Sequence, residues 1–110
     1  MGYLLSFARS LHVKSQRNQI QLETMQISRS RASITSRIAA MNKSMEGVDA
    51  GDPDVQFLQM TKERLLAWDN ILETRLAYLQ TREKQLAAEE ESLSGALDSQ
   101  IKNSTPKYQG

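Results

Sequence analysis

Hydrophobic residues recur every seven positions along two stretches of the chain. The first series is Val13, Ile20, Ile27, Ile34, Met41 and Val48, and the second is Leu58, Leu65, Leu72, Leu79, Leu86 and Leu93. A sustained seven-residue apolar repeat keeps one stripe of a helix facing a partner helix, which is typical of coiled-coil packing. The sequence therefore predicts an all-α fold in which two long helices of matched length meet along a seam formed by these residues.

The two series are separated by residues 46–54, where Gly, Asp and Pro cluster. Gly47 or Gly51 can adopt the left-handed conformation that ends a helix, and Asp52 before Pro53 is typical of a helix N-cap followed by the first helical residue. We therefore expect an antiparallel helical hairpin. Its predicted parts are an N-terminal segment and first helix over 1–50, an Asp-Pro turn over 51–54, a second helix over 55–102 and an extended tail over 103–110.

A fold-back about Pro53 also predicts which residues lie opposite one another, because partner residue numbers then add to about 106. This register predicts two attractive flanking ion pairs, Arg37 with Asp69 and Arg17 with Glu89. It also predicts two like-charge contacts, Arg31 with Arg75 and Glu23 with Glu83. Since exposed ion pairs contribute little to stability, we expect the apolar series to fix the register.

Further large apolar residues fall outside the predicted seam, at helical spacings that indicate a second apolar stripe on each helix. Two helices alone make a thin core, and a helix with two apolar stripes normally has neighbours on two sides. We therefore predict a subunit interface formed by Leu4, Leu11, Met25, Leu66, Trp68, Ile71, Leu76, Tyr78 and, in the tail, Tyr108. The alternative is that these residues widen a single broad seam.

The composition restricts the chemistry that one chain can perform. The sequence has no Cys and a single histidine, His12. Disulfides, thiol nucleophiles and Cys- or His-based metal clusters are therefore excluded within one chain. No Gly-rich phosphate loop and no nucleophile–base pair is present, so we expect no enzymatic activity, no cofactor and no metal.

The charge and hydropathy patterns restrict the partners. The formal net charge is +1 at pH 7, which argues against a strongly basic nucleic-acid binder. No apolar run reaches the roughly 18 residues that a transmembrane helix needs, so we expect no transmembrane segment. The remaining partners are other proteins, including copies of this chain.

The turn sequence Gly51-Asp52-Pro53-Asp54, leading into the amphipathic Val55-Gln56-Phe57-Leu58, resembles that of the needle and inner-rod subunits of type III secretion systems. Those subunits are small Cys-free helical hairpins that leave the cell without a cleaved signal and polymerise into helical tubes. The resemblance covers the general layout of residues 13–101. Coiled-coil export chaperones and stalk proteins of the same machines are similar in pattern.

The pattern and the resemblance predict a structural protein, a hairpin subunit that associates with copies of itself into a filament or tube. Such a filament would lie at the cell surface or outside the cell after leaderless export. The alternative is a cytoplasmic coiled-coil adaptor or export chaperone whose outer stripe binds a client helix.

Overall fold

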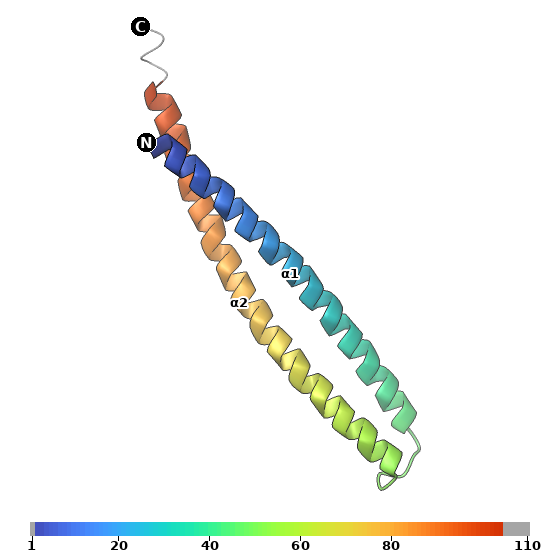
Figure 1. Cartoon of the computed structure of the whole chain (residues 1–110). Helices are drawn as coiled ribbons and strands as arrows, with labels where there is room; N and C mark the ends of the chain where they lie inside the picture. Colours follow the sequence, from blue (N-terminus) through green and yellow to red (C-terminus); the bar gives the residue numbers. More distant parts are fainter. Residues whose placement is uncertain (1, 105–110) are drawn as a thin grey trace. The chain divides into compact units, whose positions relative to one another are not determined.

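The computed structural model describes residues 2–104, which form two helices, α1 over Gly2–Met45 and α2 over Pro53–Ser104 (Figure 1). The two helices pack against each other as an all-α helical hairpin, and no strand occurs between residues 2 and 104. The predicted fold class is therefore confirmed. The helical pattern continues almost without interruption because Gly and Pro are confined to the chain start, the turn, Gly95, Pro106 and Gly110.

The turn between the helices is made by specific caps. Gly47 has a φ of 71°, a conformation that L side chains rarely adopt, and this lets the chain leave α1 after Met45. At the other side of the turn, the Asp52 carboxylate accepts a hydrogen bond from the Asp54 N–H at 2.8 Å. Asp52 is therefore the N-cap of α2 and Pro53 is its first residue, as predicted.

These caps correct the predicted boundaries. The first helix ends at Met45 rather than near residue 50, and the connection covers residues 46–52 rather than 51–54. The second helix begins at Pro53 instead of residue 55, because Asp52 already caps it. It continues to Ser104, past the predicted end at Lys102. The rest of the predicted tail, residues 105–110, lies outside the described residues.

The hairpin has two compact halves, each with its own core. The turn half comprises residues 23–78, and its buried apolar side chains are Ile27, Ile34, Val55 and Leu72. The terminal half comprises the described residues up to 22 together with those from 79, and its buried apolar side chains are Val13, Leu79 and Leu86. Each core thus takes residues from both helices.

Eleven of the twelve predicted seam residues are buried or partly buried. The exception is Val48, which is 43% exposed because α1 has already ended at Met45 and Val48 lies in the turn. Val55, one turn before Leu58 on α2, is only 5% exposed and belongs to the core instead. The sequence pattern followed a single position in each heptad, so it could not identify Val55. This residue lies in a second row of seam positions, between those of the apolar series.

That other row consists of partly buried positions that alternate with the apolar series at spacings of three and four residues. In α1 it is formed by Ser10, Arg17, Thr24, Arg31, Ile38 and Met45, and in α2 by Val55, Lys62, Asp69, Leu76, Glu83, Glu90 and Leu97. A coiled coil normally has apolar residues in both rows. Here one row is apolar and the other is largely polar, so much of the seam depends on ion pairs.

Candidate interaction surfaces

Arginine side chains of α1 meet carboxylates of α2 within the polar row. In the terminal half, Arg17 contacts Glu83, with Nη2 to Oε1 at 2.6 Å, and also Glu90. In the turn half, Arg31 Nε donates to Asp69 Oδ1 at 3.0 Å. These side chains are one quarter to one third exposed, so their charges are only partly screened by solvent.

Two further ion pairs lie on the flanks of the seam. Arg75 Nε donates to Glu23 Oε1 at 2.8 Å in the turn half, and Arg9 pairs with Glu89 in the terminal half. The hydrogen bond from Arg75 lowers the pKa of Glu23, and the hydrogen bond from Arg9 lowers the pKa of Glu89. The hydrogen bonds that Arg17 donates to Glu83 and to Glu90 raise the pKa of Arg17. These hydrogen bonds therefore stabilise the charged forms of Glu23, Glu89 and Arg17.

The ion pairs differ from those that the predicted register gave. Asp69 pairs with Arg31 rather than Arg37, and Glu83 pairs with Arg17 rather than Glu23, a shift of six residues in both cases. The turn over 46–52 moves the point of fold-back toward the N-terminus and so causes this shift. Each of these arginines also reaches a second carboxylate farther along α2, Arg31 to Glu73 and Arg17 to Glu90, so the ion pairs span more than one turn of that helix.

The shift also removes the predicted like-charge contacts. All four residues of those contacts form attractive pairs in the structure: Arg31 with Asp69, Arg75 with Glu23, and Glu83 with Arg17. The predicted pair of Arg17 with Glu89 is likewise replaced, because Glu89 contacts Arg9. The seam therefore brings opposite charges together at these positions.

A second row of mostly exposed side chains runs along the outer side of α2, where Arg75 at one edge pairs with Glu23 of α1. We name this the outer stripe, and its members alternate at spacings of four and three residues: Phe57, Thr61, Arg64, Trp68, Ile71, Arg75 and Tyr78. Thr61 is partly buried and the other six are exposed. The stripe lies wholly within the turn half.

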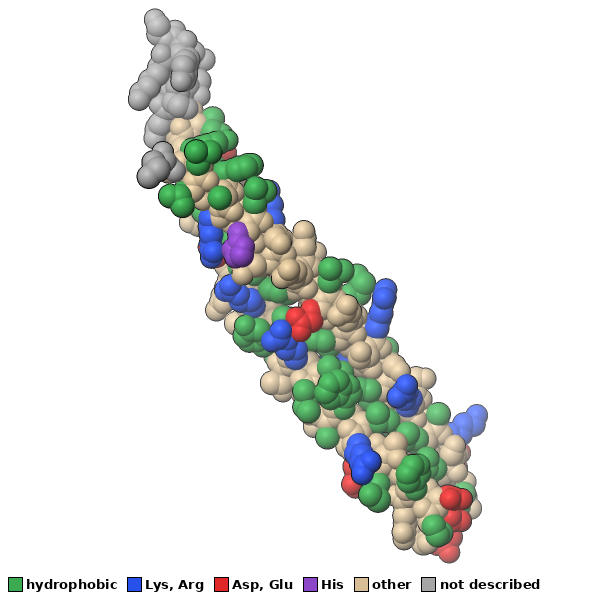
Figure 2. Space-filling model, in the orientation of Figure 1, with side chains coloured by type: hydrophobic (Ala, Val, Ile, Leu, Met, Phe, Trp, Pro, Cys, Tyr) green, Lys and Arg blue, Asp and Glu red, His purple; other side chains and the backbone are tan. Residues whose placement is uncertain are grey.

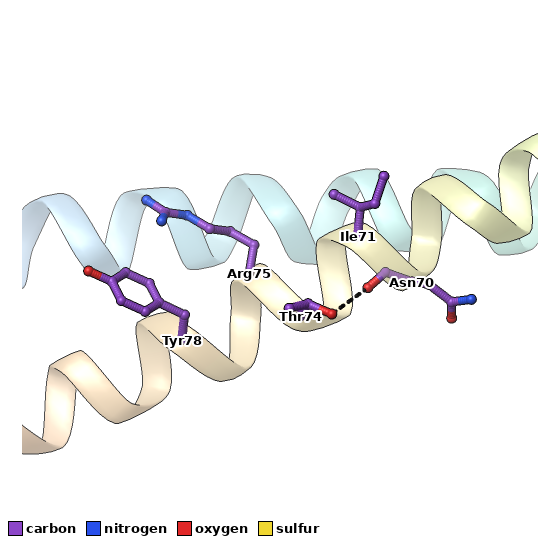
Figure 3. Close-up of a pocket in the computed structure, with 5 residues that line it drawn as sticks. All are labelled: Asn70, Ile71, Thr74, Arg75 and Tyr78. Atoms are coloured by element: carbon purple, nitrogen blue, oxygen red, sulfur yellow. Dashed lines mark hydrogen bonds between the residues drawn. The ribbon is translucent and has the colours of Figure 1, made fainter.

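The outer stripe borders a shallow open depression of about 430 Å³, lined by Asn70, Ile71, Thr74, Arg75 and Tyr78 (Figure 3). Ile71, Arg75 and Tyr78 project from successive turns of α2, and the Arg75 guanidinium lies 5.0 Å from the centroid of the Tyr78 ring. The Thr74 hydroxyl donates to the Asn70 carbonyl at 3.0 Å, which keeps that hydroxyl turned to its own helix. The surface is therefore chiefly apolar and aromatic, with a guanidinium at its edge.

A separate apolar group occupies the start of α1. We name it the N-terminal cluster; it consists of Tyr3, Leu4, Leu5, Phe7 and Leu11, all of which are exposed. The rings of Tyr3 and Phe7 stack, with centroids 6.3 Å apart and planes 6° apart. Successive helical residues point 100° apart, so the cluster faces several sides of α1. Figure 2 shows that hydrophobic side chains gather in groups on the displayed face.

The predicted interface residues divide among these surfaces. Leu4 and Leu11 belong to the N-terminal cluster, and Trp68, Ile71 and Tyr78 belong to the outer stripe. Met25 and Leu66 are exposed elsewhere; Leu66 lies two residues from Trp68 and so points some 200° away from it.

The two remaining predicted interface residues are Leu76 and Tyr108. Leu76 is partly buried in the polar row, so it belongs to the seam and not to an outer interface. Tyr108 lies outside the described residues.

Sequence reasoning missed several exposed apolar residues: Tyr3, Leu5, Phe7 and Phe57. Phe57 could have been found from a heptad count started at Ile71 or Tyr78, because it lies 14 and 21 residues before them. The N-terminal residues follow no single row, so a periodicity search cannot detect them.

Within residues 2–104, no helix is long and apolar enough to cross a membrane, and no group of acidic or His side chains is arranged to hold a metal ion. No family model, curated protein or solved structure matches this chain.

Proposed function

We propose that the protein is a structural subunit, a helical hairpin that assembles with copies of itself into a filament or tube. The observation that carries the proposal is the presence of two separate exposed apolar surfaces, the outer stripe on the turn half and the N-terminal cluster on the terminal half. Soluble monomers seldom expose large contiguous apolar patches, and such patches usually mark interaction sites.

Two surfaces favour an open assembly over a closed one. A subunit with a single self-complementary surface stops at a dimer, whereas contacts that do not close generate filaments. The N-terminal cluster faces several sides of α1, so one client helix could cover only part of it. This favours packing among several copies over the alternative role as an adaptor that binds a single client helix. In this proposal the chain works at the cell surface or outside the cell, as the needle subunits that it resembles do.

Sedimentation over a concentration series, together with electron microscopy, tests the proposal. We expect particles whose size grows with concentration, because an open array adds subunits without limit. A variant with Leu4→Ser and Leu5→Ser should keep its helicity and stop at a discrete small oligomer, since it retains only the outer stripe. The matched control is Leu22→Ser, which removes an exposed leucine from α1 outside the cluster and should assemble like wild type.

Two outcomes would contradict the proposal. A wild-type chain that stays a helical monomer or a fixed dimer at high concentration would contradict the filament. A cluster variant that assembles as well as wild type would show that the N-terminal cluster takes no part.

A further inference from the structure

The outer stripe has the spacing of a coiled-coil seam. Its residues alternate at four and three positions from Phe57 to Tyr78, in the same way as the rows that join α1 to α2. A stripe with this period remains on one side of a helix only when the partner is another helix running alongside it. A globular or flat partner would not require this period to be kept over about six helical turns.

We propose that two copies of the chain pair antiparallel along their outer stripes, in the register that places Arg64 opposite Trp68 of the partner subunit and Arg75 opposite Phe57 of the partner subunit. This inference rests on the proposed function and names one of the contacts by which the assembly forms. The same register places Thr61 opposite Ile71 of the partner subunit. Each of these three residue pairs then occurs twice, because the contact has two-fold symmetry.

The exposed area is sufficient for a contact between two copies. About half or more of the Phe57, Trp68, Ile71 and Tyr78 side chains is exposed, and an aromatic side chain can bury about 150–250 Å². The four residues thus offer roughly 450–500 Å² on each copy, or about 1,000 Å² for two, which is about the lower limit for a specific interface. The arginine stems would add to this area.

The charge of Arg64 disfavours parallel pairing. In a parallel pair each residue meets its own copy, so Arg64 would face Arg64, and Arg75, which Glu23 already pairs within its own chain, would face Arg75. Such repulsion within an apolar contact is costly because like charges are brought together as water is removed. Antiparallel pairing avoids both contacts.

The charges and the helix length then select one antiparallel register. A shift of one heptad in one direction places Arg64 opposite Arg75 of the partner subunit. A shift in the other direction places Arg75 and Tyr78 beyond the start of α2 at Pro53, opposite the turn. The intermediate register places each arginine against an aromatic ring, an arrangement that attracts a guanidinium. Arg75 already lies over the Tyr78 ring within its own helix.

Cysteine crosslinking tests this geometry without background, because the chain has no cysteine. One chain carries Thr61→Cys and a second, mass-tagged chain carries Ile71→Cys. The proposal expects a mixed disulfide between the two chains. It expects little disulfide in either chain alone, because two copies of residue 61 lie ten residues apart along the contact, about 15 Å, beyond the reach of a disulfide.

Arg64→Ala gives an independent readout of the register. If the proposed register is right, Arg64→Ala removes two arginine–aromatic contacts from the dimer. Each contact is worth about threefold in affinity, so the dimer should weaken about tenfold. The heptad-shifted register would lose a repulsion instead, and the dimer would tighten. Arg82→Ala is the matched control. Arg82 follows the stripe on the same helix and faces no aromatic residue of the partner subunit in this register, so the dimer of this variant should have the affinity of the wild-type dimer.

The outcomes separate this inference from the proposed function. Disulfides formed by the Thr61→Cys chain with itself would overturn antiparallel pairing, and tighter association of Arg64→Ala would overturn the register. Assembly without the mixed disulfide would overturn the stripe contact while leaving the filament in place. A chain that remains monomeric at all concentrations would overturn both.

Discussion

Truncation of Leu72 to alanine should destabilise the hairpin far more than the same truncation of Leu66. Both leucines lie on α2 in the turn half, but Leu72 is 9% exposed in the seam and Leu66 is 45% exposed outside it. Removing three buried carbon atoms costs about 2.4 kcal/mol at about 0.8 kcal/mol each, and an uncollapsed cavity raises the cost toward about 5 kcal/mol. A two-helix seam can close partly around the gap, so we expect about 2–3 kcal/mol for Leu72→Ala.

Leu66→Ala should cost about 1 kcal/mol or less, because only about half of the side chain leaves water on folding and alanine favours the helix slightly. Urea unfolding followed by far-ultraviolet circular dichroism measures both values. Protein concentrations low enough to prevent self-association are needed, since assembly adds to apparent stability. Equal losses for the two variants would refute the assignment of the leucine series to the core. Leu72→Asp, which buries a charge at the same position, should abolish most of the helicity.

Three further predictions concern the seam. Asp69→Arg should lower the melting temperature, and the added substitution Arg31→Asp should recover most of the loss because Arg31 is the partner of Asp69; recovery with Arg37→Asp instead would support the pair first predicted. Arg17→Ala should lower the melting temperature by several degrees, because two carboxylates are left together without their cation, and added salt should reduce this loss. The lowered pKa of Glu23 means that its ion pair stabilises the fold above pH 4.5, the ordinary value, and that this contribution is lost as pH falls through the lowered value. Glu23→Gln should therefore make acid unfolding less steep, and an unchanged acid profile would show that the pair does not contribute.

The amino-acid pattern determined most of the local structure. A seven-residue repeat predicts a helix with a partner because the period keeps one face buried, and this holds whatever the partner is. The caps are equally local: Asp52 with Pro53 begins α2, and Gly47 was one of two glycines predicted to end α1. The apolar series also identified eleven seam residues, since burial follows from the helical face alone.

The register and the division of the outer surface depended on the tertiary structure. Hydrophobic burial is non-directional and nearly equal for registers one heptad apart, so the apolar series could not choose between them. The choice came from the turn length and from pairs such as Arg31 with Asp69, whose partners are far apart in sequence. Likewise, Leu66, Trp68 and Leu76 are all apolar residues of one helix. Leu66 is exposed by itself, Trp68 lies in the outer stripe and Leu76 lies in the seam. Which face a neighbour covers is decided by how the two helices pack, and that is a property of the folded chain rather than of its pattern.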